Sequence, residues 1–261
     1  MKRSLIDTKA CDFPEEIRDI LTGADVYDSS CSKEAKVFFI DKGAGYFLKS
    51  APAHSLEKEA LLSRYFHSIG LGANIISYIS KERDWLLSER VQGEDLTHAF
   101  YLSEPEKLCD TLAKAARFLH DSKFQNCPVN DRVSDYFSTV YENFERGIYD
   151  TSLSISGEYP KSAKEAIYEI EKNKGLLKSD TLIHGDFCLP NVIFDGWKFS
   201  GFIDLGASGI GDRHIDLFWC AWTLYYNLGT DKYRDRFFDA YGREAIDKDA
   251  LRTVMLCEAF G

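Results

Sequence analysis

The stretch TLIHGDFCLPNVIFDGWKFSGFIDLG, residues 181–206, carries the densest set of sequence signals in the chain. Two short apolar segments, VIF and SGFID, flank an Asp-Gly turn, and this pattern is typical of a β-hairpin. A His-Gly-Asp tripeptide ending at Asp186 precedes the hairpin, Asn191 lies at its mouth, and Asp204 ends its second strand. The pattern predicts that these three side chains converge on one spot.

Two carboxylates and an amide at this spacing suit one kind of chemistry. A hard divalent cation such as Mg²⁺ prefers oxygen ligands and keeps several waters, so one carboxylate and one amide oxygen are enough to hold it. A second carboxylate can then orient a hydroxyl nucleophile and accept its proton, which is what phosphoryl transfer requires of a protein. A loop aspartate that caps backbone amides would explain His-Gly-Asp alone, but it explains the combined spacing poorly.

The segments before residue 91 predict strands and one helix. AKVFFI (35–40) and GYFLKS (45–50) are apolar runs joined by a turn-rich link, and NIISYIS and DWLLSERV predict two further strands. Between these pairs, apolar residues recur at helical spacing over 56–69, with Ser55 as the expected N-cap and Gly70 at the end. We expect an antiparallel sheet with one helix packed on it.

The segments after residue 93 predict a mostly helical region. An apolar stripe over 105–122 is typical of an amphipathic helix, and residues 131–148, 161–174, 214–229 and 231–242 also have helical patterns. The change in composition near 91–94 is the candidate boundary. The fold class is therefore α+β, with a small lobe over 1–91 and a larger helical lobe over 92–261.

Composition and charge exclude several classes of protein. The chain has 261 residues, 44% of them hydrophobic and 14% aromatic, which argues for a folded domain. A net charge of −10 argues against sequence-independent nucleic-acid binding and suits a cationic partner. Seven scattered cysteines without a C-x-x-C pair fit neither a zinc site nor a disulfide framework. With no transmembrane or signal segment expected, we expect a cytoplasmic protein.

Residues 181–206, with GDRHIDL (211–217) after them, resemble the catalytic segment of the aminoglycoside 3′-phosphotransferases, which belong to the protein-kinase-like superfamily. The resemblance extends over nearly the whole chain and implies a bilobal kinase fold with a five-stranded N-terminal lobe. It implies that Asp186 is the catalytic aspartate and that Asn191 and Asp204 hold Mg²⁺ against the nucleotide phosphates. Asp216 resembles the helix aspartate that fixes the catalytic loop.

The resemblance also implies a nucleotide site in the N-terminal lobe. Lys49, at the end of GYFLK, matches the lysine that pairs with the α- and β-phosphates of ATP or GTP. Its partner would be Glu59, with Glu57 as the competing candidate on another face of the helix. A lysine that faces the interior needs a counter-charge, so Lys49 and its glutamate are expected to form a pair.

Further nucleotide contacts are implied less directly. The chain has no G-x-G-x-x-G motif, and the resemblance places a serine-bearing loop before AKVFFI, with Ser32 contacting phosphate. Phe47 falls where the family stacks an aromatic ring on adenine. Glu89 to Val91 would form the hinge whose backbone reads the edge of the base.

The substrate wall departs from the family pattern. Aminoglycosides are polycations, and the family holds them with carboxylates. Here the loop 152–160 has Glu158 as its only acid, and Tyr226 stands where a helix glutamate is usual. The C-terminal D-E-x-F pattern keeps one acid, Glu258.

The sequence therefore predicts an ATP-dependent, Mg²⁺-requiring kinase that phosphorylates the 3′-hydroxyl of an aminoglycoside and so confers antibiotic resistance. The same chemistry on another small hydroxylated substrate is the alternative, and a nucleotide-binding protein without turnover is a third possibility. The expected partners are the nucleotide and the small-molecule substrate, with no nucleic acid and no membrane.

Overall fold

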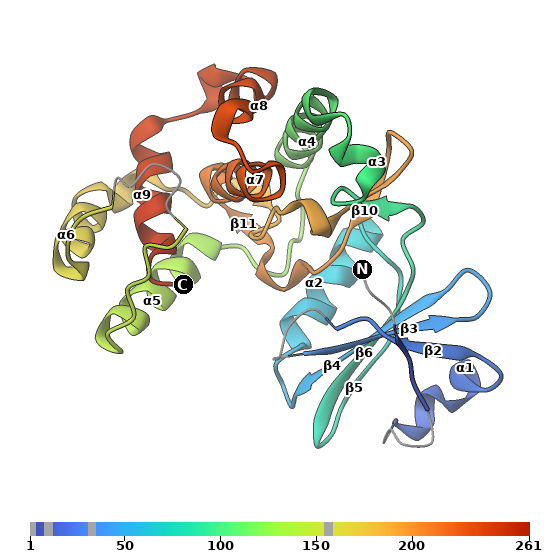
Figure 1. Ribbon diagram of the computed structural model, residues 1–261. Coiled ribbons are helices and arrows are strands. Elements are labelled where there is room, and N and C mark those ends of the chain that lie inside the picture. The colour runs from blue at the N-terminus through green and yellow to red at the C-terminus, as the bar shows by residue number, and fades with distance from the viewer. Residues whose placement is uncertain (1–3, 8–12, 31–34, 154–158) are drawn as a thin grey trace. The chain divides into compact units, whose positions relative to one another are not determined.

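The computed structural model describes residues 4–7, 13–30, 35–153 and 159–261. The chain divides into two compact units (Figure 1). The first unit comprises residues 1–92 and 200–206, and the second comprises residues 93–199 and 207–261. The expected lobes were 1–91 and 92–261, whereas the first unit also includes Gln92 and the seven residues 200–206, which return to it after a long stretch of the second unit.

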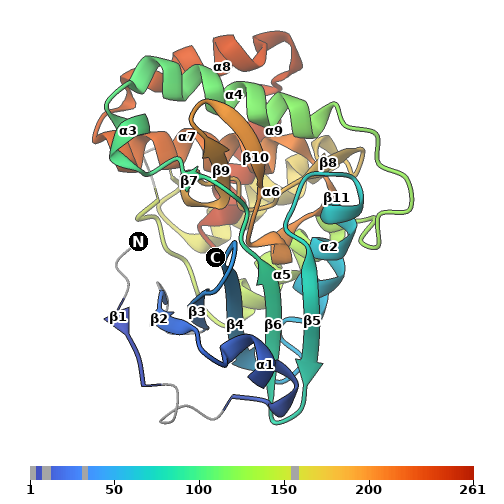
Figure 2. The ribbon, with the colours of Figure 1, turned by 90° about the vertical axis from the view of Figure 1, so that its right-hand side faces the viewer.

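The first unit is built on a six-stranded sheet with the order β1-β2-β3-β4-β6-β5. Its strands are β1 (Ser4–Leu5), β2 (Asp25–Asp28), β3 (Lys36–Asp41), β4 (Tyr46–Pro52), β5 (Ile75–Ser80) and β6 (Arg83–Glu89). All neighbouring strands are antiparallel, as the sequence predicts, and β4 to β6 run together in Figure 2. The resemblance implied five strands, and the short β1 adds a sixth at the edge of the sheet. A short helix, α1 (Arg18–Leu21), lies between β1 and β2 in the chain.

One long helix, α2 (Glu57–Ser68), accompanies this sheet. Its end follows the prediction, since Gly70 adopts φ +77° just after the last helical turn. Its expected N-cap is wrong, because the Ser55 hydroxyl donates to the Pro52 carbonyl instead. The carboxylate of the fully buried Asp84 on β6 accepts from the backbone N–H groups of His54 and Leu56 at 2.9 and 2.8 Å. A side chain on a neighbouring strand thus caps α2.

The second unit is mainly helical. Its helices are α3 (Ala99–Leu102), α4 (Pro105–His120), α5 (Arg132–Glu145), α6 (Ala163–Asn173), α7 (Arg213–Leu228), α8 (Arg234–Tyr241) and α9 (Lys248–Glu258). The five helical patterns expected after residue 93 correspond to α4 to α8. Each buries the apolar face that its periodicity defines, and α4 alone has eight buried residues.

Three short strand pairings hold the polar loops of the second unit. β8 (Thr181–Ile183) pairs with β11 (Gly209–Gly211), and β7 (Glu94–Asp95) pairs with β9 (Val192–Asp195). The predicted hairpin is present, with β10 (Lys198–Phe202) following β9 across the Asp-Gly turn. The chain passes from the second unit to the first within β10.

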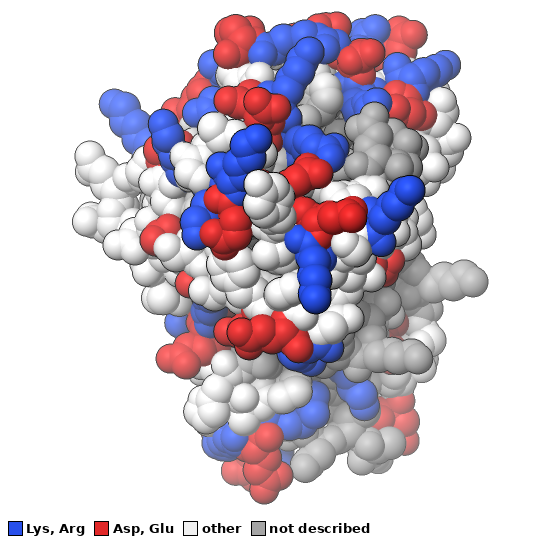
Figure 3. Space-filling model, turned by 90° about the vertical axis from the view of Figure 1, so that its left-hand side faces the viewer, with Lys and Arg blue, Asp and Glu red and all other residues white. Residues whose placement is uncertain are grey.

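Each unit has its own apolar core. In the first unit, Ile40, Leu48 and Leu87 are nearly inaccessible between the sheet and α1. In the second unit, Val254, Ile215 and Ile183 are the centre of a cluster around α7 and α9. Among the described residues, no helix has the length and apolar character needed to cross a membrane. On the face shown in Figure 3, acidic and basic side chains are interspersed.

Candidate active site

The first unit holds a lysine between two carboxylates. Lys49 on β4 lies 2.8 Å from Glu59 Oε2 and 2.8 Å from Asp204 Oδ1, measured from its Nζ. Glu59 is buried on α2, whereas Glu57 is exposed, so the competing candidate does not pair with the lysine. The expected pairing of Lys49 with Glu59 is confirmed, and Asp204 joins the pair from 155 residues away in the sequence.

Burial and charge act in opposite directions on this cluster. Burial by itself would lower the pKa of Lys49, but the charges of Glu59 and Asp204 outweigh it and raise that pKa. Burial raises the pKa of Glu59, the charge of Lys49 opposes this, and the charge of Asp204 adds to it. Lys49 is therefore held as a cation, and the two acids compete for it.

The backbone directs Asp204 outward from the strand that precedes it. Asp204 has φ +59°, a left-handed conformation that non-glycine residues rarely adopt. Its side chain is 51% exposed although that of Lys49 is only 20% exposed. A carboxylate held in a strained conformation at the end of a strand is typical of a functional position.

The second unit holds the loop that carries Asp186. The side-chain amide of Asn191 donates to both the backbone carbonyl and Oδ2 of Asp186, at 3.0 and 2.9 Å. Asn191 belongs to a 3-10 turn (Leu189–Asn191) that leads into β9. His184 braces the same loop, since its Nδ1 accepts from the Asp186 N–H at 3.3 Å. The loop thus fixes the carboxylate of Asp186 on the amide of Asn191.

A fully buried aspartate on α7 holds the backbone of this loop. Asp216 accepts from the N–H of His184 at 2.8 Å and from the N–H of Gly185 at 2.7 Å. His120, on α4, lies 3.0 Å from the same carboxylate through Nε2. The structural role expected for Asp216 is confirmed. His120 is itself a buried residue with both ring nitrogens in contact, since its Nδ1 lies 2.8 Å from the hydroxyl of Tyr241.

Gly185 is required by both backbone conformation and space. Its φ is +81°, and a Cβ atom built on it would lie 2.1 Å from the carbonyl oxygen of Ala207. The chain after Asp204 therefore packs directly against the loop before Asp186. The expected convergence of Asp186 and Asn191 with Asp204 itself stays a prediction, because Asp204 belongs to the other unit.

The expected base-binding residues lie on the sheet of the first unit. Phe47 is half-buried on β4 and packs against Phe39, with ring centroids 5.3 Å apart. Glu89 ends β6 and its N–H donates to the carbonyl of Asn74, while Val91 follows it and is half-buried. Ser32 lies outside the described residues. The roles of these residues stay predictions.

The expected substrate residues occupy different environments. Glu158 lies outside the described residues. Glu258, at the end of α9, is 7% exposed and accepts from the hydroxyl of Tyr136 at 2.7 Å and from the indole of Trp219. Burial raises the pKa of Glu258 to about 7, and the charge of Asp186 adds to the increase. Tyr226 on α7 is 68% exposed.

Three residues of this region were not found from the sequence. Asp84 caps α2 and so positions Glu59, while Tyr136 and Trp219 hold Glu258. Asp84 carries no motif, and Tyr136 and Trp219 lie in amphipathic helices where an aromatic residue signals packing. Tyr136 lies 122 residues from Glu258 in the sequence, so no local sequence pattern predicts their contact.

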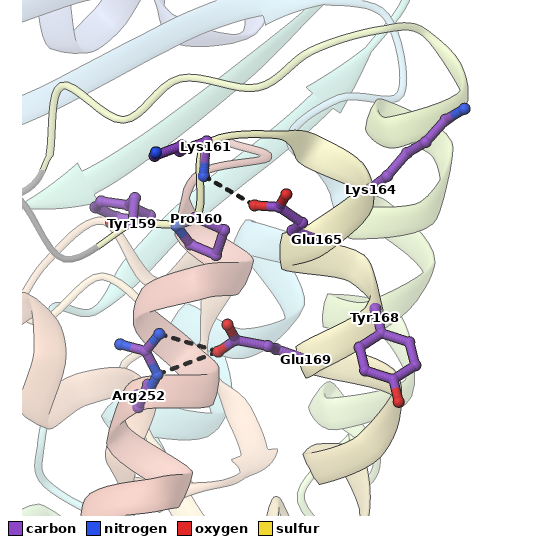
Figure 4. Close-up of a pocket in the computed structure, with 8 residues that line it drawn as sticks. All are labelled: Tyr159, Pro160, Lys161, Lys164, Glu165, Tyr168, Glu169 and Arg252. Carbon is purple, nitrogen blue, oxygen red and sulfur yellow. Dashed lines mark hydrogen bonds and ion pairs between the residues drawn. The ribbon is translucent and has the colours of Figure 1, made fainter.

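A separate cavity of about 690 Å³ lies between α6 and α9 (Figure 4). Across it, Arg252 contacts Glu169 at 3.0 Å, and the carboxylate of Glu165 accepts from the backbone N–H of Lys161. None of the residues predicted to act in catalysis lines this cavity, so we assign it no part in the chemistry.

The donor atoms fit a magnesium ion better than a softer metal. Asp204 offers an accessible carboxylate, and the nitrogen of the Asn191 amide is directed at Asp186, which leaves the amide oxygen as the ligand atom. Over the described residues, no group of three or more His, Cys, Asp or Glu side chains forms a closed metal site. Oxygen donors of this kind suit Mg²⁺, which commonly binds through one or two protein oxygens together with substrate phosphates.

The sequence and the fold define a phosphotransferase. The profile of the phosphotransferase enzyme family matches residues 32–254. A probable aminoglycoside 3′-phosphotransferase from Lactococcus lactis is 51% identical over 251 residues, covering 95% of both chains. An aminoglycoside 3′-phosphotransferase from Escherichia coli is 26% identical over 92% of this chain and 87% of its own.

Solved structures agree on the fold. An aminoglycoside phosphotransferase from Streptomyces rimosus superposes with a TM-score of 0.75 over 98% of each chain at 22% identity. The same enzyme with ADP and streptomycin superposes with a TM-score of 0.70 over 86% of this chain and 90% of its own. The family model and the 51% identical relative show that the chain belongs to the phosphotransferase enzyme family, in its aminoglycoside 3′-phosphotransferase branch.

Proposed function

We propose that this protein transfers the γ-phosphoryl group of ATP to the 3′-hydroxyl of an aminoglycoside, with Mg²⁺ as cofactor. The observation that carries the proposal is the placement of Lys49 between Glu59 and Asp204, at 2.8 Å from each. A half-buried cation beside an exposed carboxylate matches the needs of a nucleotide phosphate and its metal. The name of the Lactococcus lactis relative supports the choice of substrate.

Each residue has a distinct role in the proposed reaction. Lys49, held in place by Glu59, neutralises charge on the α- and β-phosphates. Asp204 and Asn191 would hold Mg²⁺ through oxygen atoms, and the bound ion would neutralise charge on the phosphates. Asp186 accepts a hydrogen bond from the substrate hydroxyl, directs its oxygen at the γ-phosphorus, and takes its proton as the new O–P bond forms and the bond from the γ-phosphorus to the departing ADP breaks.

The remaining roles extend the proposal. The backbone of Glu89 and Val91 reads the base, Phe47 packs against it, and Ser32 contacts phosphate. Glu158, Tyr226 and Glu258 face the sugar. ATP is the proposed donor, with GTP as the variant to compare, and the cytoplasm is the proposed location because the nucleotide is available there.

ADP release with MgATP tests the proposal across kanamycin, neomycin, gentamicin and several alcohols without amino groups. We expect turnover with kanamycin and neomycin, and a loss of at least about 10³-fold in kcat for Asp186→Asn. Asp195→Asn is the matched control, because Asp195 is an exposed aspartate at the end of β9 and its replacement should leave kcat unchanged. Turnover with the alcohols alone would contradict the substrate, and full activity of Asp186→Asn would contradict the catalytic role.

A further inference from the structure

One face of α7 carries three aromatic side chains in a continuous row. Trp219, Trp222 and Tyr226 have the spacing i, i+3 and i+7, which places them on one side of a helix. The rings of Trp222 and Tyr226 are stacked with centroids 5.0 Å apart and an interplanar angle of 15°. Trp219 meets Trp222 edge to face at 5.5 Å. We call these three residues the aromatic row.

The row runs from the surface to a buried carboxylate. Tyr226 is 68% exposed, whereas Trp222 and Trp219 are half-buried against the core of the second unit. At the inner end, the indole of Trp219 hydrogen-bonds to Glu258. Between Trp222 and Tyr226 on the same helix, the hydroxyl of Thr223 accepts from the N–H of Leu189 at 3.2 Å, three residues after Asp186. The helix that carries the row therefore also contacts the loop of the proposed catalytic carboxylate.

Packing explains only part of the row. Trp219 and Trp222 contribute to the apolar core, but a tyrosine that leaves two-thirds of its surface in water contributes little to burial. The stack on Trp222 holds its ring in one orientation and leaves the outer face open. An open aromatic face attracts a cation, and desolvation strengthens that attraction.

We propose that the aromatic row is a cation–π subsite that receives an ammonium group of the substrate, with Tyr226 as its outermost ring. This inference rests on the proposed function, since an aminoglycoside is a substrate with several ammonium groups. The row binds one of them by its ring faces, while Glu258 supplies the carboxylate at its inner end. Recognition on this wall thus depends on aromatic faces in addition to carboxylates.

Steady-state kinetics of single variants test the subsite. Tyr226→Leu should raise the KM for neomycin about 5-fold, the effect expected of one exposed cation–π contact, and leave the KM for ATP unchanged. Tyr226→Phe keeps the ring and should retain the wild-type KM. Tyr168→Leu is the matched control, because Tyr168 is an exposed tyrosine on α6, 74% accessible, outside the row.

A binding measurement separates this inference from the proposed function. Titration of intrinsic tryptophan fluorescence with neomycin and with spermine should give a saturable change in the wild type that is weakened in both Tyr226→Leu and Trp222→Leu. An unchanged KM and unchanged binding in Tyr226→Leu would overturn the subsite, as would a Tyr226→Phe variant as impaired as Tyr226→Leu. Saturable, ring-dependent binding of both amines without any turnover would contradict the proposed function and support the subsite.

Discussion

Replacing Asp216 with asparagine tests how much the hydrogen bonds from this carboxylate stabilise the loop that carries Asp186. The two carboxylate oxygens accept from two backbone N–H groups of that loop, at 2.8 and 2.7 Å, and contact His120. Asparagine has the same shape but presents an NH₂ group in place of one oxygen. One buried N–H then faces a second donor, and the hydrogen bonds that remain are made to a neutral acceptor.

The size of the effect follows from these contacts. A hydrogen bond to a charged group contributes about 1.5–3 kcal/mol, and a neutral one contributes about half of that. Loss of one bond and weakening of the others lowers the free energy of unfolding by about 3 kcal/mol. For a chain of this size, that corresponds to a decrease in Tm of about 6–12 °C. We also expect kcat to fall at least 10-fold at temperatures where the variant is folded, because Asp186 is displaced.

Thermal unfolding and ADP release measure the two effects on the same preparation. The matched control is Asp121→Asn, since Asp121 has a side chain 55% exposed and pairs with Arg117 on the surface. Exposed pairs contribute about 0–1 kcal/mol, so its Tm should change by at most about 3 °C. If Asp216→Asn behaves like this control, the reasoning about the loop is refuted.

Three further outcomes are expected. The pKa of Glu258 is about 7 in the folded protein against 4.5 ordinarily, so the folded state binds an extra proton between these pH values, and the free energy of unfolding should fall by about 3 kcal/mol as the pH rises from about 4.5 to 8. Urea unfolding at several pH values should show this decrease in the wild type and not in Glu258→Gln, and an equal dependence of the unfolding free energy on pH in both proteins would disprove it. Lys49→Met should raise the KM for ATP at least about 10-fold, whereas the exposed Lys36→Met should not, and equal KM values would argue against the phosphate role. Gly185→Ala should lower Tm far more than Gly147→Ala, because both have positive φ but only Gly185 has a backbone atom in the way; equal Tm losses would exclude the steric explanation.

The sequence predicted most of what local pattern and elementary electrostatics control. Periodicity placed α2 and the sheet strands, and the resemblance to the aminoglycoside 3′-phosphotransferases implied the pair of Lys49 with Glu59 that the structure shows. Spacing brought Asn191 to Asp186, where the structure shows two hydrogen bonds. These features depend on residues that are close in the chain or constrained by a strand or helix period.

What the sequence did not predict depends on contacts between distant segments. The N-cap of α2 comes from Asp84 on another strand, so the nearby Ser55 was a reasonable but wrong choice. The burial of Glu258 requires Tyr136 and Trp219, which no pattern links to it.

The return of residues 200–206 to the first unit has a consequence for synthesis. Phe202 donates its N–H to Leu71 and forms a parallel bridge with Gly72, and Asp204 pairs with Lys49. A ribosome that has released residues 1–92 has therefore not yet supplied the last segment of that unit. More than a hundred residues of the second unit must be translated first, so the N-terminal unit stays incomplete until they have been synthesised. A fragment that ends at residue 92 would lack Asp204, the second carboxylate beside Lys49.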